Sequence, residues 1–301
     1  MRVAALPAAL CAGLPMRASE AAEPLLSRPI PASGESLPAV GLGTWQAFDV
    51  AGQAGELAEA RGALARFADL GGTLVDSSPM YGTSETVLGD LAAALGLHKR
   101  LFFATKVWTS GRDAGIRQME ESIRRMRTGA KGPLDLMQVH NLVDVRTHLA
   151  TLREWKAAGR VRYVGVTHYT ESAYAEVERV LRGGGIDFLQ INYSLAERSA
   201  DRRLLGIAAE SRIAVIINRP FAEGALFRRT AGKPLPAWAG EIGCASWAQF
   251  FLKWILSHPA VTCAIPGTRS ARHVEDNLGA ARGALPDEPT RRKMAAFIDA
   301  L

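Results

Sequence analysis

The chain has 301 residues, a length that suits two domains of average size or one α/β barrel of about 250 residues. Hydrophobic residues make up 48% and charged residues 22%, and the 29 glycines and 15 prolines are spread along the chain. This composition excludes disordered, collagen-like and low-complexity proteins. The net charge of +6 comes without a long Lys/Arg block, so attraction for small anionic molecules is favoured over nucleic-acid binding.

The cysteines do not indicate a structural role. Cys11, Cys244 and Cys263 are far apart and include no C-x-x-C pair. A disulfide framework and a metal site are therefore not expected.

Residues 1–30 are predicted to be an extension that precedes the folded unit, 31–301. The apolar stretch 3–14 is too short to span a membrane as a helix, which needs about 20 residues. It resembles the apolar part of an export signal, either whole or truncated, and a start at Met16 is the alternative interpretation. A cytoplasmic location is expected by default, with periplasmic export if the stretch is a signal peptide.

Short β-branched or apolar runs, the pattern of buried strands, recur eight times. They are 40–45, 73–77, 101–107, 134–140, 161–167, 188–193, 213–218 and 261–266. Amphipathic stretches with apolar residues at helical spacing alternate with them. These are 54–70, 85–95, 115–126, 145–158, 171–181, 201–210, 246–257 and 272–281.

Strict alternation of strands and helices predicts right-handed parallel crossovers. The sequence therefore predicts the α/β class, as a single-domain (β/α)8 or TIM barrel. A doubly wound open sheet is less consistent, because no G-x-G-x-x-G turn follows an early strand. The segment 221–243 is predicted to be a long insertion, and 291–301 a C-terminal helix after the breaks at Pro286 and Pro289.

Polar residues close three consecutive predicted strands. Asp76 ends the second strand, with Tyr81 in the loop beyond it, Lys106 ends the third and His140 ends the fourth. Each has a structural explanation taken singly, as a helix cap, an ion pair, a rim aromatic or a satisfied polar group. Because catalytic groups of such barrels lie at the carboxyl ends of the strands, the four are expected to form one site.

The chemistry of this set is that of a proton donor. A lysine cation held by a carboxylate favours the phenolate, so Lys106 is expected to lower the pKa of Tyr81. His140 would orient a carbonyl oxygen toward the phenol. No metal or cysteine pair is available to supply electrons, so the expected electron donor is the hydride of a nicotinamide cofactor.

These motifs resemble those of the aldo-keto reductase superfamily over about residues 38 to 281. The matching segments are VGLGTW, LVDSSPMYGTSE, FFATKVW, DLMQVHN, YVGVTHY, FLQINYS, residues 247–259 and AIPGTRSARHVEDNLGA. The resemblance implies that Asp76, Tyr81, Lys106 and His140 are a catalytic tetrad. Tyr81 would donate the proton to an aldehyde or ketone carbonyl that NADPH reduces.

The resemblance also implies a set of cofactor-binding residues. They are Thr44, Thr167, His168, Gln190, Asn218, Arg219, Gly267, Thr268, Arg269, His273, Asp276 and Asn277.

Three of these residues depart from the family pattern. His168 replaces an asparagine, Asn218 stands where an aromatic often stacks on the nicotinamide, and His273 replaces an arginine that grips the 2′-phosphate. Arg269 and Arg272 flank His273, so NADPH is the expected cofactor, with NADH possible.

The substrate is expected to be a small or flat aldehyde or ketone, because the loops at the barrel mouth are short. Trp45, Met80, Trp108 and Asn141 are its predicted contacts, although Trp108 is also suited to the core. Two other functions are consistent with the residues, namely a Schiff-base lyase that uses Lys106 and a nucleotide-sensing regulatory protein. A monomer or weak oligomer is expected.

Overall fold

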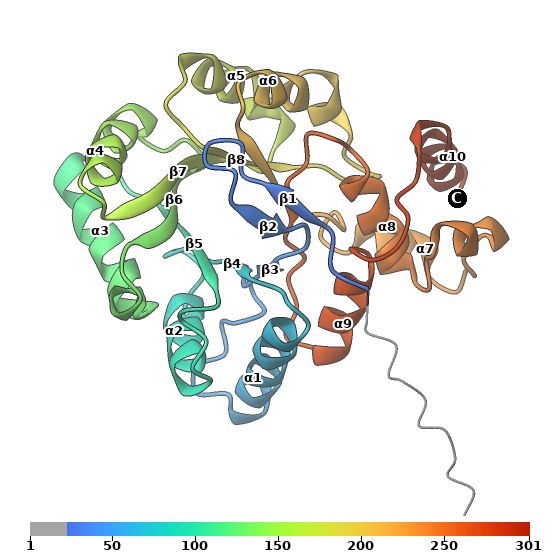
Figure 1. Cartoon of the computed structure of the whole chain (residues 1–301), viewed down its shortest axis with the longest axis horizontal. Helices are drawn as coiled ribbons and strands as arrows, with labels where there is room; N and C mark the ends of the chain where they lie inside the picture. Colours follow the sequence, from blue (N-terminus) through green and yellow to red (C-terminus); the bar gives the residue numbers. More distant parts are fainter. Residues whose placement is uncertain (1–22) are drawn as a thin grey trace, which may run out of the picture.

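Eight parallel strands form one curled sheet in a computed structural model that describes residues 23–301. The strands are β3 (Leu42–Gly43), β4 (Leu74–Asp76), β5 (Phe102–Val107), β6 (Leu134–His140), β7 (Val161–Thr167), β8 (Phe188–Asn192), β9 (Ala214–Asn218) and β10 (Cys263–Ala264). Bridges from Val40 to Ala264 and from Gly43 to Gly267 join the first strand to the last. The predicted (β/α)8 barrel is confirmed (Figure 1).

Helices surround the sheet (Figure 1). They are α1 (Ala54–Asp69), α2 (Ser84–Ala94), α3 (Arg112–Arg125), α4 (Val145–Ala157), α5 (Tyr174–Gly183), α6 (Leu204–Glu210), α8 (Trp247–Leu256) and α9 (Ala271–Gly279). Short 3-10 helices are η1 (Thr128–Ala130), η2 (Glu171–Ala173), η3 (Ser199–Arg202) and η4 (Ala237–Ile242). The helix predicted at 201–210 is divided, because η3 ends before α6 begins.

The long insertion contains η4 and the helix α7 (Ala225–Thr230), which the sequence analysis did not predict. The C-terminal helix α10 (Glu288–Asp299) begins earlier than expected. Asp287 caps it by accepting a hydrogen bond from Thr290 N at 2.9 Å. Pro289 lies in the first turn, where proline loses no helical hydrogen bond, so it does not break this helix.

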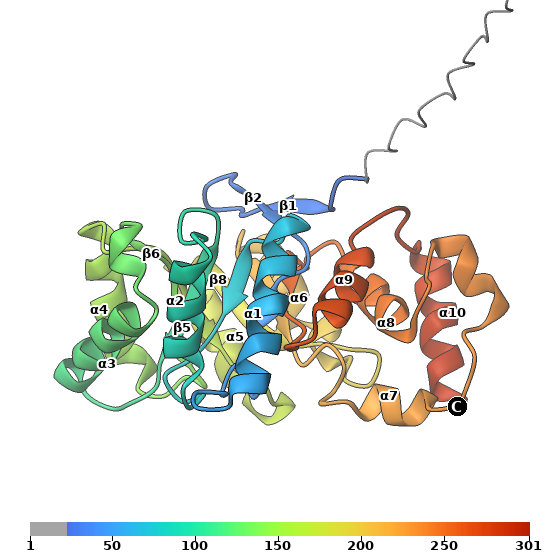
Figure 2. The ribbon, with the colours of Figure 1, turned by 90° about the horizontal axis from the view of Figure 1, so that it is seen from below.

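An antiparallel hairpin, β1 (Ser27–Pro29) and β2 (Ser36–Pro38), covers one end of the barrel (Figure 2). Its first strand lies within the predicted extension, residues 1–30. Ile30 and Leu37 are buried in the same apolar cluster as the inward side chains of the barrel. The predicted export signal and Cys11 lie outside the described residues, and none of the described helices could span a membrane.

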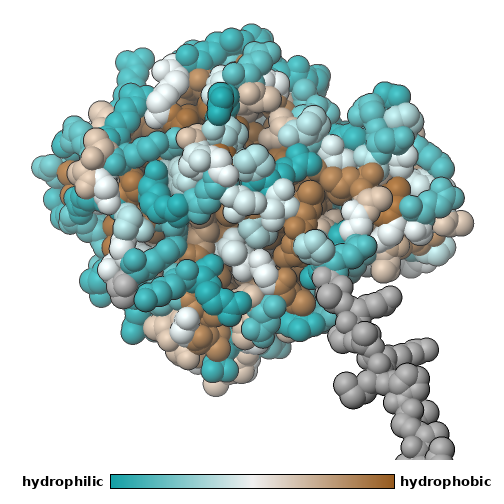
Figure 3. Space-filling view, in the orientation of Figure 1, coloured by the Kyte–Doolittle hydropathy of each residue, from teal (hydrophilic) through white to brown (hydrophobic). Residues whose placement is uncertain are grey.

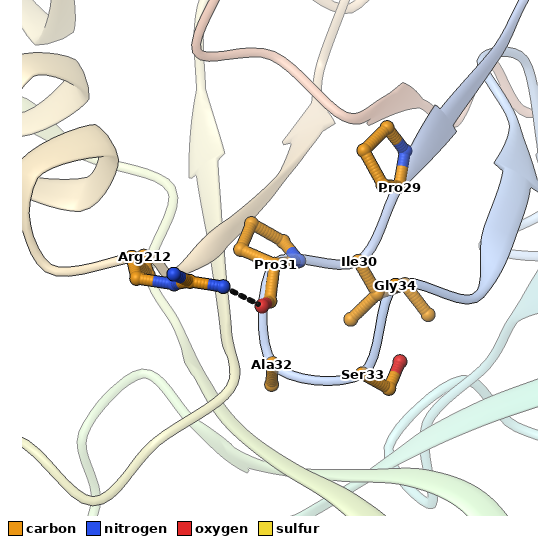
Figure 4. A pocket seen from close by; sticks show the side chains of 7 residues that line it. All are labelled: Pro29, Ile30, Pro31, Ala32, Ser33, Gly34 and Arg212. Carbon is orange, nitrogen blue, oxygen red and sulfur yellow. Dashed lines mark hydrogen bonds between the residues drawn. The ribbon is translucent and has the colours of Figure 1, made fainter.

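The hairpin turn is also tied to the start of β9. Arg212 Nη2 donates to Pro31 O at 3.0 Å across a shallow hollow (Figure 4).

Seen in the orientation of Figure 1, the outer rim of the molecule is covered mostly by hydrophilic side chains (Figure 3).

Inward side chains change from apolar to polar along the strands, because alternate residues share one face of a strand. On β5 the inner cluster includes Phe102 and Ala104, and the next residue in this series is Lys106. On β8 the inward Phe188 is followed by Gln190. The barrel is therefore apolar at the hairpin end and polar at the carboxyl end.

Two helical glycines provide a test of the packing between helices. A Cβ at Gly89 in α2 would lie 2.2 Å from Arg125 O, whereas one at Gly62 in α1 meets nothing within 4 Å. We expect Gly89→Ala to lower the free energy of unfolding by about 1–3 kcal/mol, because backbone must shift. Gly62→Ala should raise it by about 1 kcal/mol through helix propensity. Urea unfolding measures both, and equal effects would contradict the close approach of α2 and α3.

Candidate active site

The centre of the site is a buried ion pair between adjacent strands. Lys106 Nζ donates to Asp76 Oδ2 at 2.6 Å and to Ser77 O at 2.7 Å. The Lys106 side chain is 0% exposed and that of Asp76 is 3% exposed. Burial lowers the pKa of Lys106, but Asp76 and Tyr81 more than offset it, so its pKa is raised and the amine stays a cation.

The second carboxylate oxygen of Asp76 is held by two amides. Gln190 Nε2 donates to Asp76 Oδ1 at 2.9 Å, and Gln138 Nε2 donates to the same atom at 3.2 Å. Thr167 Oγ1 in turn donates to Gln190 Oε1 at 3.2 Å. The network thus joins β4, β5, β6, β7 and β8 across the barrel.

Tyr81 lies over the lysine. Lys106 Nζ is 4.9 Å from the centre of the Tyr81 ring, and the Tyr81 and His140 rings meet edge to face at 5.8 Å. Burial raises the pKa of Tyr81, and this effect exceeds the lowering by Lys106. Lys106 lowers the pKa of Tyr81 as expected, but the net shift is upward, because desolvation of the phenolate outweighs the nearby cation. The phenol is fully protonated at neutral pH.

His140 is held neutral. Burial, followed by the charges of Lys106 and His168, lowers the pKa of His140 to about 2. Its Nδ1 lies 3.0 Å from Ser78 Oγ, and Met80 N donates to that same Ser78 oxygen at 3.4 Å. When the Ser78 hydroxyl donates to Nδ1, the His140 proton lies on Nε2, available to a ligand oxygen.

The predicted cofactor residues on the strands lie at the same end of the barrel. Thr44 is buried and donates to Asp76 O at 3.0 Å. Asn218 Nδ2 donates to His168 O at 3.0 Å, which ties the loops after β9 and β7 together. The side chain of His168 stacks on Tyr169 at 5.7 Å.

Arg219 follows Asn218 in a left-handed backbone conformation with φ 50°. It donates to Tyr169 O at 3.1 Å and pairs with Glu197 at 3.3 Å and Glu223 at 3.5 Å. The Glu223 contact is made by Arg219 Nε, whereas Asn218 Oδ1 is buried without a hydrogen-bond partner. Asn218 Oδ1 therefore has free capacity for a polar ligand.

The predicted phosphate-binding residues lie on the loop after β10 and on α9. Gly267, Thr268, Arg269 and His273 are at least partly exposed there. Arg269 is already paired, with Glu56 at 3.2 Å and Glu59 at 3.0 Å, both on α1.

Asp276 faces another helix instead of open solvent. Its Oδ1 accepts from Ser246 Oγ and from Gln249 Nε2, both at 2.8 Å, and the neighbouring Asn277 is buried. In this structure Asp276 joins α9 to α8.

Large apolar side chains are exposed around the barrel mouth. Trp45, Met80 and Trp108, the predicted substrate contacts, are 47%, 40% and 42% exposed. Tyr169, which the sequence analysis did not select, is 45% exposed after β7. Asn141 follows β6 in a left-handed conformation with φ 52°, and its Oδ1 is buried without a partner.

Sequence reasoning also missed Gln138 and Ser78. Gln138 lies two residues before His140 on the same strand, so the two share the inward face, and this spacing was a usable signal. No such signal marked Ser78.

Within residues 23–301, no group of three or more His, Cys, Asp or Glu side chains is arranged to hold a metal ion.

A family model described as the aldo/keto reductase family matches residues 39–293. The chain belongs to this family. The match confirms both the resemblance seen in the motifs and the enzyme class, an oxidoreductase.

Relatives and solved structures agree with that assignment. The chain is 32% identical over 252 residues to the methylglyoxal reductase YeaE of Escherichia coli strain K12, covering 80% of this chain and 84% of that protein. An aldo/keto reductase from Klebsiella pneumoniae in complex with NADP and acetate gives a TM-score of 0.75 at 26% identity, covering 88% of this chain and 93% of that one. A second Klebsiella pneumoniae aldo-keto reductase, in complex with NADPH, gives 0.73 at 25% identity, covering 92% and 96%.

The lowered pKa of His140 predicts acid sensitivity. In the unfolded chain His140 takes up a proton near pH 6.5, whereas in the folded chain it stays neutral down to about pH 2. Stability is thus present above the unfolded pKa and falls with pH below it, by up to about 1.4 kcal/mol per pH unit. Urea unfolding at several pH values between 7 and 4 should show a shallower fall for His140→Gln than for the wild type. Parallel curves would show that His140 is not held neutral.

Proposed function

We propose that the protein reduces aldehydes or ketones to alcohols, with NADPH as the hydride donor and Tyr81 as the proton donor. The observation that carries this proposal is the buried Lys106–Asp76 pair beneath a protonated phenol and a neutral imidazole. Such a site stabilises an oxygen that gains negative charge and then protonates it.

The residues at the mouth fit the cofactor. Asn218 Oδ1 is a buried polar atom without a partner, as expected of a group that completes its hydrogen bonds on a polar ligand. NADPH would supply a hydride to the carbonyl carbon. We propose that Thr44, Thr167, His168, Gln190, Asn218 and Arg219 hold the nicotinamide half, and that Gly267, Thr268, Arg269, His273, Asp276 and Asn277 hold the adenosine half.

The tetrad then divides the work on the carbonyl oxygen. His140 Nε2 donates a hydrogen bond that orients the oxygen toward Tyr81. Tyr81 gives up its phenolic proton, and the Lys106 cation stabilises the phenolate that remains. Asp76 keeps Lys106 in place, and its other carboxylate oxygen accepts from two amide donors.

The rim indicates an apolar or flat substrate. Trp45, Met80, Trp108 and Tyr169 are four of the five exposed large hydrophobic residues of the described chain. Planar side chains around a polar floor favour small aldehydes and ketones with an apolar or flat body. Because one relative is named a methylglyoxal reductase, methylglyoxal is the first compound to assay.

The Schiff-base alternative is disfavoured. A nucleophilic amine must lose its proton, whereas Lys106 is fully buried, donates two hydrogen bonds and has a raised pKa. The regulatory alternative is tested by a panel of aldehydes and ketones, on which a purely nucleotide-sensing protein would oxidise no NADPH.

A cytoplasmic location stays a prediction, as does a monomer or weak oligomer. That residues 31–301 make up the folded unit also stays a prediction.

Removal of the phenolic hydroxyl tests the proposed role of Tyr81. We expect Tyr81→Phe to lower kcat by about 10²–10⁴-fold, the range for loss of a general acid, while the Kd of NADPH changes less than about twofold. Absorbance of the reduced cofactor follows turnover, and fluorescence titration gives the Kd. Turnover at the wild-type rate in this variant would overturn the assignment.

Two acidic residues are expected to weaken the preference for NADPH over NADH. Glu56 and Glu59 pair with Arg269, so a 2′-phosphate must compete with them for its charge. The double variant Glu56→Gln with Glu59→Gln should bind NADPH more tightly than the wild type, by up to about 30-fold, because each of the two released charge–charge contacts contributes about 1 kcal/mol or less. The Kd of NADH, which lacks the phosphate, is the internal control. Equal changes for both cofactors would place the phosphate elsewhere.

A further inference from the structure

The loop that carries Tyr81 is attached to its surroundings by the three residues at its end. Asp49 Oδ1 accepts from Thr83 N and from Thr83 Oγ1, both at 2.8 Å. Ser84 Oγ donates to Thr44 O at 3.3 Å, at the end of β3. Glu85 accepts from Thr105 on β5. Three consecutive residues thus join the loop to the connection between β3 and α1 and to β5.

The Glu85 contact differs from the other two in its burial. Glu85 is 1% exposed in the first turn of α2, and Thr105 Oγ1 donates to its Oε1 at 2.6 Å. Its Oε2 is buried without a hydrogen-bond partner and lies 3.7 Å from Arg125 Nη1. Keeping a carboxyl group inside the helix layer with one hydrogen bond and one long ion pair costs desolvation energy, which indicates that the contact has a use other than folding.

The position of this contact shows what it constrains. Thr105 directly precedes Lys106, and because side chains alternate along a strand, Thr105 faces α2 while Lys106 faces the barrel interior. Glu85 comes four residues after Tyr81, separated from it by a single turn in which Ser84 N donates to Tyr81 O at 3.0 Å. The Tyr81 loop and β5 are therefore in contact twice. On the inner side of β5, Tyr81 lies over Lys106, and on the outer side Glu85 accepts the hydrogen bond from Thr105.

We propose that Glu85 is a positioning residue, which through Thr105 fixes the distance between the Tyr81 hydroxyl and the Lys106 cation. It touches neither substrate nor cofactor. Without its anchor the start of α2 can shift away from β5, and the phenol moves relative to the cation that stabilises its phenolate. A displacement of about 1 Å at such a site can cost about 10²-fold in rate. This inference rests on the proposed function for its kinetic consequence, but not for its structural one.

The test removes the hydrogen bond while keeping the volume of the side chain. Thr105→Val should lower kcat about 10- to 100-fold with the KM for carbonyl and the Kd of NADPH within about twofold. Thr105→Ser retains the hydroxyl and should restore kcat to within about threefold of the wild type. Glu85→Ala, which also removes the Arg125 ion pair, should lower kcat at least as much as Thr105→Val, and the double variant should fall no further than Glu85→Ala, because both substitutions remove the Glu85–Thr105 contact.

A matched control separates positioning from stability. Thr262 Oγ1 accepts from Val215 N at 3.0 Å, just before β10 and away from the tetrad. Thr262→Val also deletes a buried hydroxyl and should lower Tm, yet leave kcat unchanged. If Thr262→Val lowers kcat as much as Thr105→Val does, or if Thr105→Val keeps the wild-type kcat, the inference is wrong.

Hydrogen exchange gives a readout that does not depend on turnover. The amides of Thr83 and Ser84, which donate to Asp49 Oδ1 and Tyr81 O, should exchange faster in Thr105→Val and Glu85→Ala but not in Thr105→Ser or Thr262→Val. Unchanged exchange in Thr105→Val overturns the anchor even if the enzyme is active. If the wild type reduces no carbonyl, the proposed function fails, and faster exchange confined to the two anchor variants still supports the anchor.

Discussion

A full positive charge inside the barrel is the constraint on which the rest of the site depends. Lys106 has no exposed surface, and its charge is offset by Asp76 and by Ser77 O. Loss of either charged partner would leave the other uncompensated, at a cost of about 3–5 kcal/mol. Asp76 therefore needs its remaining acceptor capacity filled, and Gln138 and Gln190 fill it. One buried charge accounts for polar residues on four strands.

The same charge, together with burial, sets the protonation states of Tyr81 and His140. Desolvation keeps Tyr81 protonated, and desolvation with the Lys106 cation keeps His140 neutral. The imidazole can then orient an oxygen without competing for the proton, and the phenol is the group that releases it. Lys106 stabilises the phenolate only once that proton has moved. Lys106 thus stabilises the phenolate formed by proton transfer more than it stabilises the phenol before the transfer. A proton donor needs this stabilisation in its deprotonated form.

The inward spacing of the strands made much of this predictable. Apolar residues alternate up to Asp76, Lys106 and His140, so a polar closing residue stands out. Gln138 obeys the same spacing but does not close its strand, because His140 follows it on the inward face. The direction in which the pKa of Tyr81 shifts depends on its burial by segments distant in the sequence. The ion-pair partners of Arg269 lie on α1, which is also far away in the chain. Neither leaves a local pattern in the sequence.

The least predictable element, the hairpin, bears on the electrostatics most directly. Its strands are short and contain Ser and Pro, which give no strand signal. Yet Ile30 and Leu37 complete the apolar layer beneath the polar one, and Glu35 accepts from Tyr163 at the bottom of the barrel at 2.6 Å. The hairpin and this apolar layer thus cover the end of the barrel opposite to the mouth. Because charge interactions strengthen as water is excluded, the hairpin helps Lys106 to act on Tyr81 and His140 from a distance.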